Sequence, residues 1–415
     1  MSALGVIESV GRTRYVDEVK HINVYPLDEK IGLLVIEGRR SRYTGNFARL
    51  TAEYYARMTE RDALDLLKRT LNIELEQDSL TSIGATIAQP YLPKLYDETE
   101  CKVEPQQTTA AEPGFIEKNI QEIDASPNRD AIILKALEEG VNGVERASME
   151  SDLTVKYVEA DGTGVSGLPR ELSDKGRDGG PAKTFEIKIG VTFNQNFCSN
   201  GFPLLENGRI FREHDSARYM GTVEKVAQFT MQLNAFAKMN GIDNADQIVF
   251  LSDGAVWLER LREKLFPNSI GIVDLYHARQ HLHKLLDSIS ILSLHGKRRA
   301  SLKEKCFHLL DLGEIDQMIT VISKHITKSN RESIEKQMEY FTVNKWKMRY
   351  GLFRATGLFI GSGVVESACK TLVENRLNGS GMRWSKKNAA NVVALRSAIY
   401  SGSYEYYDSY EYSAA

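Results

Sequence analysis

The sequence contains few cysteines, and they lie far apart. Its 415 residues include only Cys101, Cys198, Cys306 and Cys369, and no two of them form a C-x-x-C pair. A zinc ribbon or a disulfide framework requires cysteines that are closely spaced or dense in the sequence. We therefore expect neither kind of site, and isolated free thiols fit a reducing cytoplasm.

Long apolar runs and targeting signals are missing as well. No stretch of about eighteen apolar residues occurs, which argues against a membrane-spanning helix. The N-terminal residues 1–12 lack the charged-then-apolar order of a secretory signal peptide. We expect a cytoplasmic protein that does not associate with a membrane.

The net charge is small but unevenly distributed. A formal charge of -3 argues against a protein that coats nucleic acid along its whole length. Counting Lys and Arg against Asp and Glu gives -10 for residues 1–290, +10 for 291–400 and -3 for 401–415. A basic C-terminal third is compatible with a local site for a polyanion. A solvated helical surface explains the same pattern.

The N-terminal part of the chain is predicted to be mostly helical. Apolar residues at helical spacing indicate helices within residues 46–71 and 80–88. These helices fit either a DNA-binding helix-turn-helix or a plain helical bundle. We assign residues 1–95 to this region and 96–150 to a linker with a short helix, because Pro, Thr, Glu and Gln are frequent there.

The pattern changes to that of an α/β protein after residue 150. The sequence predicts, in order, three strands, a helix, a strand, a helix, a strand and a helix. The predicted strands cover residues 153–158, 185–193, 208–212, 248–251 and 270–273, and the first predicted helix covers 222–239. The last two strands are fully apolar, which is typical of a sheet covered on both faces. This succession is that of an RNase H-like fold, a mixed sheet flanked by helices.

The predicted elements also divide the rest of the chain into domains. We expect the first part of the catalytic core at 151–284, a helical insertion at 285–355, the end of the core with its catalytic helix at 356–400, and an acidic, Tyr-rich tail at 401–415. The insertion is inferred because the sequence between the predicted strands and the last core helix is too long for a bare core of this type. It is helical in pattern and basic.

Two aspartates follow predicted strands. Asp161 opens an Asp-Gly-Thr-Gly string, and Asp253 opens Asp-Gly-Ala-Val-Trp. Binding sites in α/β sheets gather beyond the carboxyl ends of strands, and a glycine after each aspartate allows a sharp turn. Asp-Gly is also an ordinary turn pair. The first string is similar to that of aspartic proteases, but the hydroxyl residue does not follow the aspartate directly and no second copy is present. Two such pairs on neighbouring strands favour a functional site.

A third carboxylate comes from the C-terminal third. The turn at residues 361–363 begins a predicted helix that runs to Leu377, with Glu366 near its first turn, where the helix dipole favours an anion. Asp161, Asp253 and Glu366 together suit two Mg²⁺ or Mn²⁺ ions, hard cations that prefer carboxylate oxygens and that accelerate phosphodiester cleavage. Without metal, three crowded carboxylates repel one another, so at least one pKa is expected to be raised. A two-carboxylate glycosidase is a remote alternative.

Four sequence blocks resemble one protein family. They are Ser-Asp-Gly-Ala-Val-Trp at 252–257, Ile-Val-Asp-Leu-Tyr-His-Ala at 272–278, Ile-Gly-Ser-Gly-Val-Val-Glu-Ser-Ala-Cys-Lys at 360–370 and Gly-Ser-Gly-Met-Arg-Trp-Ser at 379–385. The blocks are similar to those of ISKra-type bacterial insertion-sequence transposases. These are DDE transposases of the Mutator-like superfamily with an RNase H-like core. The resemblance covers roughly residues 150–400, and more weakly 26–33.

The resemblance implies an enzyme that cleaves and joins DNA strands. Asp161, Asp253 and Glu366 would be the three ligands of two metal ions, Mg²⁺ or Mn²⁺. Asp274 and His277 match a D-x-x-H signature that contacts the scissile region or orients the site. The implied partners are transposon ends and target DNA, bound by a homo-oligomer in a bacterial cytoplasm near the nucleoid. A zinc site formed by Asp274, His277 and His281 is an alternative, although no H-E-x-x-H string is present.

Basic and aromatic residues of the C-terminal third are candidates for contact with DNA. Cations that alternate with Trp346 suit phosphate contact and base stacking, and a glycine-bounded loop presents Arg383 and Trp384. The candidates are Arg298, Arg299, Lys345, Trp346, Lys347, Lys370, Arg376, Arg383 and Trp384. We expect a steeply salt-dependent affinity that is lost when the basic residues of 297–299 and 345–349 are neutralised. A solvent-facing basic helix, and a core position for Trp384, are the simpler alternatives.

One feature departs from the family. Many members carry a Cys-rich zinc ribbon near the N-terminus, but no cysteine precedes Cys101 here. Recognition of transposon ends is therefore in question. An RNase H-like nuclease and an inactive DNA-binding descendant remain as alternative functions.

Overall fold

The computed structural model describes the following residues in full: 43–97, 113–147, 151–172, 183–289, 298–328 and 330–405, and residue 148 by its backbone alone. Of the backbone alone it further describes short N-terminal strands and residues 290–293 and 297. The N-terminal strands form two antiparallel pairs, β1 (Tyr15–Asp17) with β2 (Ile22–Val24) and β3 (Leu33–Ile36) with β4 (Arg39–Thr44).

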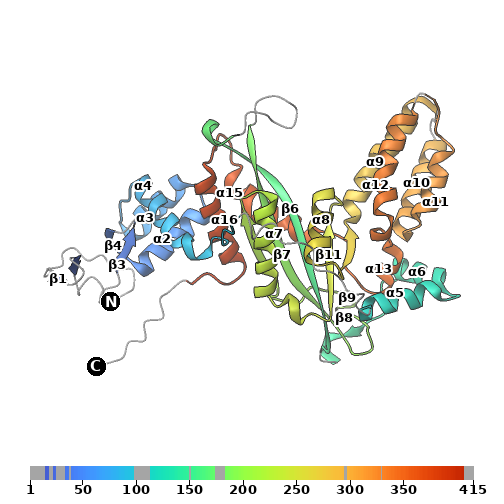
Figure 1. Ribbon diagram of the computed structural model, residues 1–415, viewed down its shortest axis with the longest axis horizontal. Coiled ribbons are helices and arrows are strands. Elements are labelled where there is room, and N and C mark those ends of the chain that lie inside the picture. Colours follow the sequence, from blue (N-terminus) through green and yellow to red (C-terminus); the bar gives the residue numbers. More distant parts are fainter. Residues whose placement is uncertain are drawn as a thin grey trace.

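A mixed five-stranded sheet forms the centre of the molecule (Figure 1). Its strands are β6 (Leu153–Ser166), β7 (Thr184–Phe197), β10 (Arg218–Thr222), β11 (Gln247–Ser252) and β12 (Ile270–Val273). The strand order is β10-β7-β6-β11-β12, with antiparallel pairing from β10 to β6 and parallel pairing from β6 to β12. The prediction of an α/β protein with a mixed sheet is therefore confirmed.

Two predicted strand boundaries are wrong. β6 does not end at residue 158 but continues to Ser166, because β7 pairs with it along its whole length, with Asp161 opposite Ile189. Asp161 thus lies within a strand, and Gly162 continues that strand instead of turning. The third strand of the sheet is β10, whereas residues 208–212 contribute only the short β9. Turn residues around Asn207 and Gly208 place that segment in a small separate sheet.

The small sheet lies at one end of β7 and consists of three short strands. They are β5 (Val144–Glu145), β8 (Leu204–Glu206) and β9 (Arg209–Ile210). Short 3₁₀ turns occur at Gln89–Tyr91, Arg146–Ser148, Pro169–Glu171 and Ile242–Asn244.

Helices cover both faces of the central sheet. On one face α7 (Val226–Met239) and α8 (Val256–Leu265) pack against Val158 and Phe250. The opposite face belongs to the main core, together with α14 (Gly363–Ala368) and α16 (Lys386–Tyr400). Successive side chains of a strand alternate between faces. Tyr157, Glu159 and Asp161 therefore share the face that α14 covers.

The N-terminal helices form a compact group beside α16 (Figure 1). α2 (Gly45–Arg57) and α4 (Gln77–Ala88) pack against each other and against α16, while α3 (Glu60–Leu71) lies next to them. The hydroxyl groups of Thr44 and Thr59 cap the first turns of α2 and α3. The predicted helices are present, and their use as a helix-turn-helix stays a prediction.

A second helical group is inserted between β12 and α14 (Figure 1). It comprises α9 (Leu275–Ser293), α10 (Lys297–Leu312), α11 (Ile315–Ser323), α12 (Arg331–Asn344), the 3₁₀ turn Lys345–Lys347 and α13 (Tyr350–Ala355). α5 (Phe115–Ala125) and α6 (Arg129–Glu138) pack against α13 at its base. Among the described residues, no helix is both long and apolar enough to cross a membrane.

Candidate active site

The strand register brings three aspartates to one edge of the sheet. Leu251 of β11 is opposite Glu159 of β6, so Asp253, two residues further on, is level with Asp161. Ser252 is opposite Val273 of β12, and Asp274 is the residue after it. Because β6, β11 and β12 are parallel, these carboxylates come together where β11 and β12 end.

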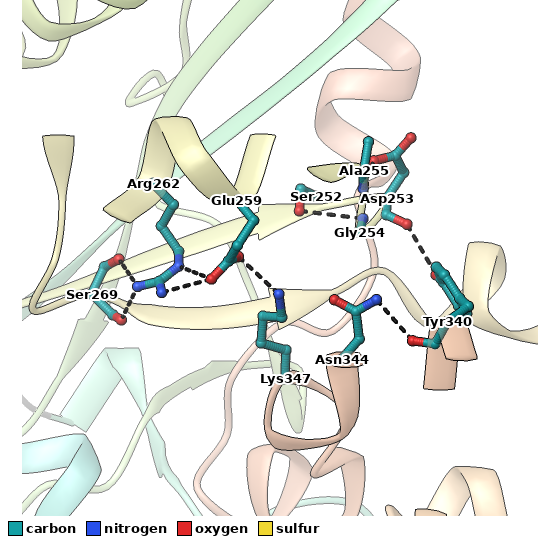
Figure 2. Close-up of polar contacts among 10 residues, drawn as sticks. All are labelled: Ser252, Asp253, Gly254, Ala255, Glu259, Arg262, Ser269, Tyr340, Asn344 and Lys347. Carbon is teal, nitrogen blue, oxygen red and sulfur yellow. Dashed lines mark hydrogen bonds and ion pairs between the residues drawn. The ribbon is translucent and has the colours of Figure 1, made fainter. Parts of the chain in front are cut away.

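A tight turn fixes Asp253 at the end of β11 (Figure 2). Its Oδ1 accepts a hydrogen bond from the N–H of Ala255 at 2.7 Å, and Gly254 adopts a φ of 86°, which only glycine adopts freely. The hydroxyl of Tyr340, from α12 of the helical insertion, donates to the carbonyl oxygen of Asp253 at 3.0 Å. The insertion therefore helps to hold the turn that carries this carboxylate.

Buried polar groups of the sheet position Glu366. The N–H of Phe359 donates to the Tyr157 hydroxyl at 3.0 Å, and the N–H of Val365 donates to Glu159 Oε2 at 2.7 Å. The chain before α14 and the first turn of α14 are thus each hydrogen-bonded to a side chain of β6. Glu366 follows in the first turn of α14, as the sequence predicts, and its Oε1 accepts from the Ser362 hydroxyl at 3.2 Å.

Asp274 and His277 form a closely bonded pair. Oδ1 of Asp274 accepts from the N–H of His277 at 2.7 Å and lies 3.1 Å from its Nδ1, while Oδ2 accepts from the N–H of Ser362 at 2.5 Å. Burial alone would raise the pKa of Asp274, but these hydrogen bonds outweigh it and lower the pKa. The hydrogen bond to Asp274 raises the pKa of His277, which favours the imidazolium.

Glu366 lies next to the Asp274–His277 pair. Asp274, His277 and Glu366 each place a possible ligand atom within 4.8 Å of the other two. Asp274 is 1% exposed, and its two oxygens already accept hydrogen bonds from the protein. It therefore acts as a positioning residue that holds His277 and the turn before Glu366, whereas Glu366 is partly exposed beside it.

Asp161 has the raised pKa that crowded carboxylates are expected to show. Burial is the main cause, and the negative charge of Asp253 adds to it, while a hydrogen bond from the N–H of Gly162 opposes it. The thiol of Cys369 lies 3.8 Å from Asp161 Oδ2. Cys369 begins a π-helical turn, Cys369–Glu374, inside the helix that carries Glu366. Such turns often occur at functional sites.

Sequence reasoning missed Glu159. This carboxyl is completely buried, and burial raises its pKa to about 8, so it carries a proton at neutral pH. Its Oε1 has no hydrogen-bond partner among the described residues. Its spacing of two from Asp161 in an alternating strand is a signal that could have revealed it. The role of Tyr340 had no such signal, because it depends on how the insertion packs.

Comparison with known proteins adds no assignment to this geometry. A scan of protein-family models gave no match to the chain, and a search of curated proteins gave none either. The functional interpretation therefore rests on the residues gathered at the sheet edge.

The donor set fits hard divalent cations. Asp161, Asp253 and Glu366 offer the carboxylate oxygens that Mg²⁺ and Mn²⁺ prefer. His281 does not join the cluster of possible ligands found in the described part of the chain. Its ring instead stacks on Tyr340, with centroids 3.8 Å apart. The alternative zinc site therefore lacks its second imidazole.

Most of the candidate cations of the insertion are paired with carboxylates. Lys347 lies 2.9 Å from Glu259 (Figure 2), Lys345 lies 3.2 Å from Asp316, and Arg299 lies 3.0 Å from Asp287. Trp346 is 70% exposed, and the Lys345 ammonium lies over its ring. Arg298 and Lys370 are exposed. The structure thus leaves only part of the basic sequence available to an anion.

The glycine-bounded loop divides its candidates between core and surface. Trp384 is 7% exposed and its indole N–H donates to the carbonyl of Leu377 at 3.0 Å, so it occupies the core position that was the simpler alternative. Arg376 is also buried, with its guanidinium over the Trp384 ring at 4.8 Å. Arg383, in contrast, is exposed.

Proposed function

We propose that this protein is an RNase H-like DNA transposase that cleaves and joins DNA strands. The observation that carries the proposal is the strand register that sets Asp161 level with Asp253 at one edge of the sheet, where Glu366 of α14 lies within 4.8 Å of Asp274 and His277. The succession β6, β7, β10, α7, β11, α8, β12 and α9 supports a core of this type. The family resemblance of the blocks around Asp253 and Glu366 supports the reaction.

Each site residue has a distinct task in this proposal. Two bound Mg²⁺ or Mn²⁺ ions would activate the attacking oxygen and stabilise the leaving oxygen of a phosphodiester. Asp161, Asp253 and Glu366 would hold them. Asp274 fixes the orientation of His277 through Nδ1, which leaves Nε2 to donate a hydrogen bond to a phosphate oxygen. The hydrogen bond to Asp274 raises the pKa of His277, which favours the imidazolium that carries this proton.

The test is a strand-transfer assay with purified protein. A supercoiled plasmid that carries the gene with its native flanks is incubated with Mg²⁺ or Mn²⁺, in parallel with Glu366→Gln, Asp161→Asn and Asp253→Asn proteins. We expect nicked and joined products that require both the metal and all three carboxylates. Cleavage without joining would make the protein a nuclease, and DNA binding without products would make it an inert descendant. Cleavage by any two of the variants would overturn the assignment of the three ligands.

A further inference from the structure

A basic cavity lies between the N-terminal helices and the end of the core. It has a volume of about 660 Å³ and is lined by residues of α3, of the segment after β6, of the 379–384 loop and of the start of α16. Four arginines line it, Arg61, Arg170, Arg376 and Arg383, against one carboxylate, Glu60. Glu60 accepts a hydrogen bond from Gln77. The lining therefore has an excess of positive charge.

The cationic groups of the cavity have few partners. Within the described part of the chain, Arg61 and Arg383 form no ion pair, and Arg170 has only a loose contact of 3.8 Å with Glu171. Arg376 is 3% exposed; its Nε donates to the carbonyl of Tyr55, but its Nη2 has no hydrogen-bond partner. A buried, unpartnered guanidinium N–H is costly unless a ligand or water accepts its proton.

The helix backbones also favour a negative charge in the cavity. Ser385 caps α16 and Thr59 caps α3, and the first residues of both helices line the cavity. A helix N-terminus favours an anion, and residues of both N-termini line this cavity. The 379–384 loop is also held against the end of β6. The N–H of Trp384 donates to the carbonyl of Ser166, and the carbonyl of Trp384 accepts from the N–H of Leu168.

We propose that this cavity binds a backbone phosphate of the DNA substrate. The inference rests on the proposed function and adds to it a second contact with DNA, made jointly by the N-terminal helices and the core. The path from Asp161 to Leu168, at ~3.3 Å per residue, is roughly 23 Å at most, and the helical path from Glu366 to Arg376, at ~1.5 Å per residue, is roughly 15 Å. Along one strand of B-form DNA, these lengths correspond to about four to seven nucleotides from the scissile phosphate.

The experiment compares the exposed arginines of the cavity with one elsewhere. Full-length Glu366→Gln protein is used as the parent, so that binding is measured without cleavage. Arg61→Gln and Arg383→Gln are added together, and Arg209→Gln, an exposed position in β9, is the matched control. Affinity for a fluorescent duplex is followed by anisotropy over a range of salt concentrations. Phosphate ethylation interference then maps the phosphates whose modification weakens binding.

We expect the affinity of the double variant for DNA to fall roughly tenfold or more. The slope of log affinity against log salt concentration should become shallower by about two, and Arg209→Gln should change neither quantity. Ethylation interference at about four to seven nucleotides from the cleavage point should disappear in the double variant but not in Arg209→Gln. Unchanged affinity, slope and interference would overturn the inference, while metal-dependent cleavage that requires Glu366 would still uphold the proposed function.

A second arm distinguishes DNA from a free phosphorylated ligand. The Tm of the parent and of the double variant is measured with inorganic phosphate and with ATP. Stabilisation of the parent by either compound, abolished in the double variant and without effect of the variant on DNA affinity, would assign the cavity to a small ligand and overturn the DNA assignment. Weak phosphate stabilisation together with the loss of DNA affinity supports it.

Discussion

The sheet edge and the helical insertion hold their charges in opposite ways. In the insertion, the guanidinium of Arg279 contacts both carboxylate oxygens of Asp311, the shorter distance being 2.6 Å. In the 3₁₀ turn after α12, Lys345 pairs with Asp316 and Lys347 pairs with Glu259 of α8. At the sheet edge, Asp161 lies level with Asp253, and Glu366 lies beside Asp274; no ion pair to any of Asp161, Asp253 and Glu366 occurs among the described residues, and the cation close to Asp161 and Asp253 is His277.

Whether a charged side chain has a partner decides what it indicates about ligands in this fold. A paired charge is explained by the structure that surrounds it, whereas like charges brought together cost free energy unless a ligand of opposite sign compensates. The sheet edge therefore predicts a bound cation, and the cavity lined by Arg61 and Arg383 predicts a bound anion. The insertion predicts neither.

The largest effect is expected from the loss of a carboxylate at the sheet edge. Glu366→Gln removes a proposed metal ligand and should lower the rate of strand cleavage by a factor on the order of 10³ or more, with DNA affinity retained. Glu374→Gln, eight residues further along the same helix, is the matched control and should cleave normally. Rates are measured with the plasmid assay at saturating Mn²⁺. Equal loss in both variants would indicate disruption of the helix instead of loss of a ligand.

A pH effect is expected from the buried Glu159. Its pKa is about 8 in the folded protein, against an ordinary value of 4.5, so the folded state retains a proton that the unfolded state releases. Stability should therefore fall as pH rises from about 4.5 to about 8, by at most roughly 4 to 5 kcal/mol. Glu159→Gln keeps an acceptor for the N–H of Val365 and should remove this dependence.

The measurement is the difference in Tm between wild type and Glu159→Gln at pH 5 and pH 8. The variant should gain stability relative to wild type at the higher pH only. A difference that is the same at both values would show that Glu159 is ionised throughout, with an unseen partner for its charge.

Opposite signs are expected when one carboxylate is neutralised in each region. Asp311→Asn breaks the ion pair with Arg279 and should destabilise the protein by about 1 kcal/mol, since both groups are only partly exposed. Asp161→Asn removes a half-buried charge next to Asp253 and should raise the Tm of the metal-free protein. Adding Mn²⁺ should then raise the Tm of wild type but not of Asp161→Asn. Destabilisation by both substitutions would contradict the distinction between the two regions.

The sequence predicted the positions of Asp253 and Glu366 in the fold better than that of Asp161. Asp253 and Glu366 were placed correctly because a buried strand and a glycine-rich turn before a helix are local patterns. Asp161 was assigned to a strand end, although pairing with β7 extends the strand past it. The hydrogen bond from the N–H of Val365 to Glu159, and that from Tyr340 to the carbonyl of Asp253, depend on contacts between distant segments, which periodicity cannot show. For the same reason, a count of basic residues could not reveal which of them are paired.

The smallest effect is expected from the lysines of the insertion, where the sequence alone predicted a large one. Lys347 is largely buried against Glu259, and Lys345 bonds to Asp316, so neither offers an uncompensated charge to a phosphate. Neutralising both to Gln should change DNA affinity by less than about threefold and the salt slope by less than one, because paired charges release few counterions on binding. The measurement is the anisotropy titration used for Arg61 and Arg383, and Trp346→Ala tests stacking by the exposed indole beside them. A larger loss from the two lysines than from the two arginines would show that the ion pairs open when DNA binds, and that pairing in the free protein does not identify its anion sites.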